Sequence, residues 1–261
     1  MISVVCMKWG TLFAPDYVNV LYRAVSRNLP MPFRFYCFTD NTAGLNKGII
    51  AQGIPDIGLP PERWNRGCWP KLNIFKPGLL PDTDLAIYFD LDLIVQSSLV
   101  PFVERAKAMK GLHIIREWNP PVWSMVPLAL RPDRGGQGSL IAWNPAEQHH
   151  IFNNFVANPG EAYEIDGDDQ NYITRVAHER HYWPHEWCVS FKRSCLWYYP
   201  FNLLFSKVRQ PKQARIVVFH GQPRPSDLVH EGNSRWGTKR KFGFGPVDWV
   251  QDYWLQGLHG E

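Results

Sequence analysis

The stretch LAIYFDLDLIV, residues 85–95, places two carboxylates inside an otherwise apolar run. Five apolar residues precede Asp90, and the apolar triplet 93–95 follows Asp92. An apolar run without polar alternation is typical of a parallel strand that helices cover on both faces. Carboxylates rarely leave water unless a cation or hydrogen-bond donors replace it. The stretch therefore predicts a central strand, and it predicts that Asp90 and Asp92 meet a positive partner where the strand ends.

The surrounding sequence alternates between strand and helix patterns. Residues 2–7 and 33–38 are apolar runs, and a helical pattern lies between them from Pro15 to 28–30. Strand, helix and strand in this order favour a parallel sheet, and thus an α/β fold in one domain over residues 1–261. Hydrophobic spacing predicts further strands at 49–50, 93–95, 112–115, 140–143 and 215–219, and short strands within the region 182–199. It predicts helices at 69–75, 100–109, 146–157 and from Asp168 or Asp169, and an irregular segment at 120–138.

Composition limits the classes of function. The 261 residues are 45% hydrophobic and 20% charged, which suits a globular domain with a sizeable core. The net charge of +4 is mild and no dense basic stripe recurs, so nucleic acid is not an expected partner. Five cysteines without CxxC spacing argue against a disulfide framework or a zinc site and favour a reducing compartment. Residues 2–7 are too short for a signal peptide, and no run approaches a membrane span.

Candidate metal ligands follow directly after two of the predicted strands. Alternate residues of an extended chain point the same way, so Asp90 and Asp92 can converge on one ion. The strand 215–219 delivers His220 to the corresponding place, and ligands of open α/β sheets bind at such carboxyl ends. Two carboxylates and an imidazole suit Mn²⁺ or Mg²⁺ with open positions for phosphate oxygens. Lys71 and Arg224 are the candidate cations for a bound diphosphate.

The acidic turn DGDDQ, residues 166–170, is the third candidate. One of its aspartates is expected to cap the following helix. Asp166, Asp169 and Gln170 could bind sugar hydroxyls or stabilise an oxocarbenium-like centre. A solvated acidic turn remains the alternative.

Four motifs in order resemble a family 8-type glycosyltransferase of the GT-A fold, the group that includes glycogenin and bacterial lipopolysaccharide galactosyltransferases. They are CWPKLNIFKPGLLPDTDLAIYFDLDLIV, GSLIAWNP, IDGDDQNYIT and VVFHGQPRP. The sequence departs from the family where Gln137-Gly138-Ser139 replaces Asn-Ser-Gly and Arg224 replaces a lysine. The resemblance implies a GT-A, Rossmann-like three-layer sandwich with a mixed, mostly parallel central sheet.

The resemblance also implies roles for particular residues. Asp90, Asp92 and His220 would bind Mn²⁺, and Asp169, Gln170 and Asp166 would lie at the donor sugar and its anomeric carbon. The nucleotide-sugar donor, expected to be a UDP-sugar, would be bound by Lys71, Asp90, Leu91, Arg224, Tyr17, Met7 and Lys8. The implied reaction is transfer of a hexosyl group to a hydroxyl of a saccharide, glycolipid or protein acceptor, with retention of configuration.

Two other functions stay open at this point. A Mg²⁺-dependent phosphatase or phosphotransferase also uses paired aspartates after a strand, and a non-catalytic protein could bind sugars through some of the twelve tryptophans. A cytoplasmic location is expected, with a peripheral contact to the inner membrane face as one possibility. The basic, aromatic segment 235–254 would supply that contact, and packing of a C-terminal helix is the competing explanation.

Overall fold

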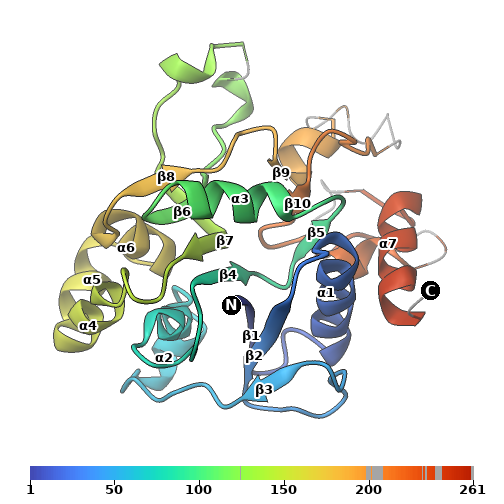
Figure 1. Ribbon diagram of the computed structural model, residues 1–261. Helices are drawn as coiled ribbons and strands as arrows, with labels where there is room; N and C mark the ends of the chain where they lie inside the picture. The colour runs from blue at the N-terminus through green and yellow to red at the C-terminus, as the bar shows by residue number, and fades with distance from the viewer. Residues whose placement is uncertain are drawn as a thin grey trace.

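The computed structural model describes residues 1–123, 125–197, 201, 208–230, 232, 234–238 and 243–259. A seven-stranded sheet lies at the centre, in the order β3-β2-β1-β4-β7-β6-β8 (Figure 1). These strands are β1 (Ile2–Lys8), β2 (Phe33–Thr39), β3 (Ile50–Gln52), β4 (Leu85–Phe89), β6 (Leu112–Arg116), β7 (Gly136–Trp143) and β8 (Arg180–Tyr182). Strand β7 is antiparallel to both of its neighbours, and the other pairs are parallel. The prediction of a mixed, mostly parallel sheet is confirmed.

A smaller, three-stranded sheet is joined to the large sheet after strand β4. It has the order β5-β10-β9 and is formed by β5 (Leu93–Val95), β9 (Cys188–Ser190) and β10 (Ile216–Val218). Strand β10 runs antiparallel to β5 and parallel to β9. Since only three residues separate the end of β4 from the start of β5, the two sheets are joined directly through residues 90–92.

Helices cover both faces of the large sheet. Alternate residues of β1 enter different cores: Val4 and Cys6 face one cluster, and Val5 and Met7 face the other. This two-sided burial explains why the strand lacks polar alternation. The first face carries α1 (Pro15–Asn28), α3 (Val100–Ala108) and part of the small sheet. The second carries the 3₁₀ helix η1 (Trp69–Phe75), α4 (His150–Ala157), α5 (Pro159–Ile165) and α6 (Asp169–Val176).

Some elements differ from the predictions. The segment 120–138 is not irregular throughout, because β7 already begins at Gly136. The helix predicted at 146–157 begins only at His150, since Asn144 accepts a hydrogen bond from the amide of Ala146 and holds a turn there. Within 182–199 a π-helix, Phe191–Cys195, follows β9, and residues 198–199 lie outside the described part. Helices α2 (Pro61–Trp64) and α5 were not predicted.

The C-terminal helix α7 (Asp248–His259) packs beside α1 (Figure 1). The rings of Trp254 and Tyr17 meet edge to face at 4.7 Å, and Arg23 donates a hydrogen bond of 2.6 Å to the carbonyl of Gly257. Trp236 is also buried. Of the predicted surface patch 235–254, these tryptophans therefore pack inside the protein, while residues 239–242 lie outside the described part.

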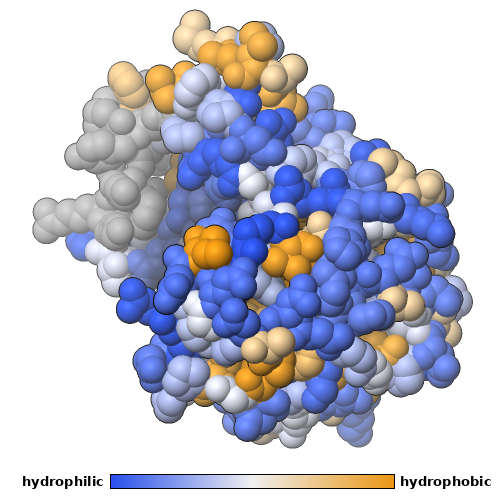
Figure 2. Space-filling view, turned by 90° about the vertical axis from the view of Figure 1, so that its left-hand side faces the viewer, coloured by the Kyte–Doolittle hydropathy of each residue, from blue (hydrophilic) through white to orange (hydrophobic). Residues whose placement is uncertain are grey.

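The face of the molecule shown in Figure 2 is mostly hydrophilic, and the loop between β6 and β7 projects from the body with an apolar end (Figures 1 and 2). Within the described ranges, no helix has both the length and the apolar character needed to span a bilayer.

The packing of α7 on α1 leads to a prediction about Gly257. A Cβ atom at this position would lie 2.6–2.9 Å from three atoms of Val20. We expect Gly257→Ala to lower the free energy of unfolding by about 1–3 kcal/mol, because the helices must separate. Gly160 of α5 has no neighbour closer than 3.8 Å, so Gly160→Ala is the control and should cost nothing. Urea denaturation measures both, and equal stability of the two variants would contradict the prediction.

Candidate functional site

The site lies where the two sheets meet. Strands β1 and β4 are parallel and end at one edge, and Asp90, Leu91 and Asp92 link β4 to β5 at that edge. The amide of Phe219 donates to the carbonyl of Asp92 at 3.0 Å. The amide of Gly221, whose φ of +82° suits glycine, faces an Asp92 carboxylate oxygen at 3.3 Å. The segment after β10 is therefore fixed directly against Asp92.

A cavity of ≈ 830 Å³ opens at this edge. Its volume lies within the range of about 300–1,000 Å³ that is common for small-molecule sites. The lining combines aromatic and aliphatic side chains with a few charged ones. The residues are Met7, Trp9, Gly10, Thr11, Leu12, Phe13, Asn65, Cys68, Lys71, Tyr88, Asp90, Leu91, Asp92, Gly221 and Arg224.

Lys71 forms the centre of a buried charge cluster. Its Nζ lies 3.2 Å from Asp90 Oδ1 and 3.1 Å from Asp169 Oδ2, and its side chain is only 7% exposed. Burial alone would lower the pKa of Lys71, but the charges of Asp169 and Asp90 raise it well above its usual value. The charged form of Lys71 is therefore favoured at neutral pH. Lys71 belongs to helix η1. This helix begins after Cys68, whose backbone is left-handed with φ +51°.

Asp90 is held by neutral donors as well. Tyr88 donates to Oδ1 at 2.8 Å, and Ser139 donates to Oδ2 at 2.7 Å. Gln137 in turn donates to the Ser139 hydroxyl at 2.7 Å and accepts from its amide at 3.0 Å. Gln137 and Ser139 lie on β7, which pairs with β4, so this network connects two neighbouring strands of the sheet. It fixes the orientation of the Asp90 carboxylate.

Asp92 differs from Asp90, because no ion pair to it is found in the described part of the chain. Burial and the nearby charge of Asp90 raise the pKa of Asp92 to about 6, although the Gly221 amide and Lys71 act in the opposite direction. Burial also raises the pKa of Asp169 to about 6. The cluster thus contains three carboxyl groups and one ammonium group, which pairs with Asp90 and Asp169 but not with Asp92, and this leaves a deficit of positive charge.

His220 does not converge with the two aspartates. Its Nε2 lies 2.6 Å from the hydroxyl of Ser190, and its ring stacks on Trp118 with centroids 5.4 Å apart. Burial and the charges of Lys192 and Arg193 lower its pKa to about 4, so the imidazole is neutral at pH 7. Over the described residues, no group of three or more His, Cys, Asp or Glu side chains is placed to hold a metal ion. The predicted set of Asp90, Asp92 and His220 is therefore not assembled in this structure.

The residues of the acidic turn separate into three roles. Asp168 is the N-cap of α6, because its side chain accepts from the amide of Asn171 at 2.9 Å, which confirms the predicted cap. Asp169 reaches Lys71. Asp166 is instead bound by Arg175, with contacts of 2.9 Å and 2.8 Å, and does not line the cavity. Gln170 lies beside Gly138. A Cβ atom added to Gly138 would lie 3.5 Å from the Cβ of Gln170.

The predicted donor-binding residues divide between the cavity and its surroundings. Met7, Leu91 and Arg224 line the cavity, with the Arg224 guanidinium 5.3 Å from the Phe13 ring centroid. Lys8 points elsewhere and reaches the carbonyl of Asn41 at 3.4 Å. Tyr17 contacts the hydroxyl of Ser226 and the ring of Trp254, outside the cavity lining.

Sequence reasoning missed several residues of the site. Tyr88 was interpreted as a core residue of the strand, although its hydroxyl binds Asp90. Ser139 and Gln137 appeared only as a departure from a motif. Trp9 and the loop 10–13 follow β1 at the same edge as Asp90, and the rule that ligands bind at carboxyl ends of strands could have found them.

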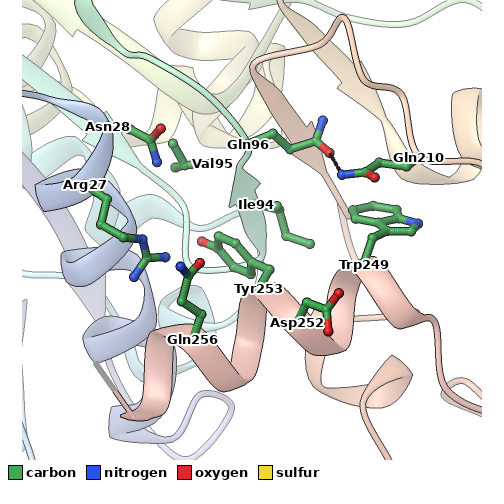
Figure 3. Close-up of a pocket in the computed structure, with 10 residues that line it drawn as sticks. All are labelled: Arg27, Asn28, Ile94, Val95, Gln96, Gln210, Trp249, Asp252, Tyr253 and Gln256. Carbon is green, nitrogen blue, oxygen red and sulfur yellow. Dashed lines mark hydrogen bonds between the residues drawn. The ribbon is translucent and has the colours of Figure 1, made fainter. Parts of the chain in front are cut away.

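A second cavity of ≈ 400 Å³ lies between α1, β5 and α7 (Figure 3). Its lining is mainly polar, and Gln210 donates a hydrogen bond of 3.2 Å to Gln96 at one side of it. None of the predicted site residues lines this cavity. It is therefore separate from the charge cluster around Lys71.

Comparison with known proteins places the fold. No family model and no curated protein sequence matches the chain. Among solved structures it is similar to the galactosyltransferase LgtC in complex with donor and acceptor sugar analogs, with 13% identity over 97% of this chain and 95% of that chain and a TM-score of 0.61. The chain has the GT-A fold.

Two further structures agree with this fold. An active-site mutant of LgtC matches at 15% identity over 90% of this chain and 92% of that one, with a TM-score of 0.58. The glycosyltransferase GlyE of Streptococcus pneumoniae matches at 12% identity over 100% of this chain and 63% of that one, with a TM-score of 0.61. At these identities the similarity concerns the fold.

The charge cluster fits a divalent cation in part. Asp90 and Asp92 offer hard oxygen ligands at one edge of the cavity, and the deficit of positive charge favours a cation there. The ring of His220 is bound to Ser190 instead. The donor set on which a metal proposal can rest is thus the pair of aspartates.

The raised pKa of Asp92 predicts an effect on stability. A carboxyl group with a raised pKa in the folded state holds its proton more tightly there, so the free energy of unfolding falls as the pH rises from 3.8 to about 6. At about pH 7.5 in a chelator, Asp92→Asn should therefore be more stable than the wild type by about 1–3 kcal/mol, and the gain should vanish near pH 4. Urea denaturation at both pH values measures it. A destabilised variant at the higher pH would contradict it.

Proposed function

We propose that the protein is a glycosyltransferase that moves a sugar from a nucleotide-sugar donor to an acceptor hydroxyl. The observation that carries this proposal is the cavity at the edge of the GT-A sheet, which is lined by Asp90, Asp92 and Lys71, and Lys71 also pairs with Asp169. One structural neighbour, LgtC, is described as bound to donor and acceptor sugar analogs. A UDP-sugar is the donor that the four motifs favour.

The cavity offers groups for both halves of such a donor. Arg224 and Lys71 are cations for the diphosphate, and phosphate oxygens would relieve Lys71 of part of its carboxylate contacts. The apolar wall of Met7, Trp9 and Phe13 suits a base and ribose. Positively charged groups at the leaving diphosphate stabilise the charge that develops there during transfer.

Asp90 and Asp92 are the residues that would hold Mn²⁺ or Mg²⁺ at this edge of the cavity. Such an ion, when bound, neutralises the leaving group and supplies Lewis-acid assistance. In this chain Tyr88 and Ser139 keep the Asp90 carboxylate oriented, and the Gly221 amide faces Asp92. His220 stays a proposed third ligand, and it would have to leave Ser190 to take that role.

Asp169 and Gln170 would lie at the donor sugar. Asp169 is buried beside Lys71, so its carboxylate can orient sugar hydroxyls or stabilise positive charge at the anomeric carbon. Asp166 is engaged by Arg175, which favours a structural role for it. The proposal of retention of configuration rests on the resemblance alone, and no nucleophile is assigned.

The competing phosphatase hypothesis has less support. Its paired aspartates usually follow the first strand, whereas Asp90 and Asp92 follow β4, after two strand–helix units. A sugar-binding protein without catalysis would not require a buried Lys71 between two carboxylates. Both hypotheses nevertheless make distinct predictions for the products formed.

The decisive experiment incubates the protein with Mn²⁺ or Mg²⁺ and a panel of nucleotide sugars and follows product release. We expect a nucleoside diphosphate from one donor, with a loss of at least about 100-fold in Lys71→Met and Asp92→Ala, because both act at the leaving group. Release of inorganic phosphate instead would support the phosphatase hypothesis. Calorimetry with UDP and Mn²⁺ tests the binding-protein hypothesis in parallel.

The acidic turn supplies a matched pair of variants for the same assay. Asp169→Asn should lose at least about tenfold in activity, because it removes a carboxylate that holds the cavity-lining Lys71 in place. Asp166→Asn should keep its activity within about threefold and lose about 1 kcal/mol of stability, because it breaks only the pair with Arg175. If Asp166→Asn were the more damaging to activity, the assignment of roles in this turn would be wrong.

A further inference from the structure

The loop between β6 and β7 carries a segment with unusual composition. The run PPVWSMVPLAL, residues 120–130, contains no charged side chain. In the structure, which does not describe residue 124, Val122 is 79% exposed, Met125 94% and Leu130 72%. Figures 1 and 2 show this segment, hereafter the apolar loop, projecting from the body with an apolar end. Water-exposed apolar groups gathered in this way usually mark an interaction surface.

The backbone of the apolar loop satisfies many of its own hydrogen bonds. The amides of Trp123 and Val126 donate to the carbonyls of Pro120 and Trp123, both at 3.0 Å. The amide of Leu130 donates to Pro127 at 2.9 Å. Prolines 120, 121 and 127 have no amide hydrogen to satisfy. Internal pairing of polar backbone groups is a condition for entering an apolar medium.

Arginines lie at the base of the apolar loop. Arg131 donates through Nε to the carbonyl of Val126 at 2.7 Å, and Arg116 reaches the carbonyl of Arg131 at 3.5 Å. Arg134 donates to the carbonyl of Trp118 at 2.7 Å. Glu117, 3.7 Å from Arg134, and Asp133 offset part of this charge, and the three arginines leave an excess of positive charge at the base that favours an anionic surface next to the apolar tip.

We propose that the apolar loop inserts into the interface of an anionic lipid bilayer, with the arginines at its base meeting the headgroups. A convex tip with few hydrogen-bonding side chains suits a deformable lipid interface better than a protein groove. The tryptophans Trp236 and Trp254 of the segment 235–254 are buried, so the apolar loop is the better-exposed surface for such contact. This inference does not rest on the proposed enzymatic function.

The register of the sheet shows from which edge of the sheet the apolar loop extends. Phe89 at the end of β4 pairs with Leu140, so the start of β7 at Gly136 lies beyond it, at the edge of Asp90. Strand β6 is antiparallel to β7 and thus ends at the same edge. The apolar loop therefore leaves the sheet at the edge that carries the cavity, and lipid binding would place this edge at the membrane.

The test is sedimentation of the full chain with vesicles, without nucleotide or metal. One set of vesicles is phosphatidylcholine, and the other contains phosphatidylcholine and phosphatidylglycerol in equal parts. We expect binding to the anionic set, weakened at least about tenfold in the triple variant Val122→Ser, Met125→Ser, Leu130→Ser, because apolar insertion supplies the affinity. The control replaces exposed Val156, Ile165 and Leu255 with serine and should bind like the wild type.

Other outcomes would overturn the proposal. These are no binding to anionic vesicles, or equal binding by the loop variant and the wild type. Gel filtration at the same concentrations provides a second readout. If the wild type forms oligomers that the loop variant does not, and neither binds vesicles, the apolar loop is an interface between copies of the chain.

Discussion

The ion pairs of Lys71 with Asp90 and Asp169 join three segments that are far apart in the sequence. They connect η1, the end of β4 and the start of α6 around one ammonium group that is nearly inaccessible to water. Removing one member of such a buried cluster leaves an uncompensated charge, so none of the three segments can move independently. The position of the sheet edge, and with it one wall of the cavity, depends on this constraint.

The cluster is not arranged for stability alone. The ammonium group of Lys71 pairs with the carboxylates of Asp90 and Asp169, while the carboxylate of Asp92 accepts a hydrogen bond from the backbone amide of Gly221. A protein core without further demands would not add the partly exposed Asp92 beside two other carboxylates, because its partial desolvation is costly. Local conflicts of this kind are expected where function, rather than folding, selects the residues.

The parts of the fold that the sequence predicted are those whose pattern is local. Strands β1, β2 and β4 were predicted because both of their faces are buried, and α1 because its apolar residues recur at helical spacing. Strand β7 was predicted too short, since its first residues are glycine, glutamine and serine, which fit a loop equally well. Their strand conformation is fixed by pairing with β6, which a local pattern does not contain.

The same distinction holds for the candidate site. Asp90, Asp92 and Lys71 were predicted from residue type and position after a strand or in a helix. The network of Tyr88, Ser139 and Gln137 was not, because it forms only when β7 lies beside β4. The surroundings of His220 likewise come from distant segments that bring Ser190 and Trp118 against its ring. The boundaries of a single domain over 1–261 stay a prediction.

The contacts that connect the two sheets affect the order in which parts of the chain fold. Asp92 and Gly221 meet across 129 positions of sequence, and β5 finds its partner β10 only over a similar separation. Contacts between such distant segments form slowly, because a long loop must close first. During synthesis on the ribosome, β5 emerges well before β10 and for that time presents an unpaired apolar edge. The edge that carries Asp92 is thus completed late, and chains cut short before residue 216 would expose β5 to aggregation.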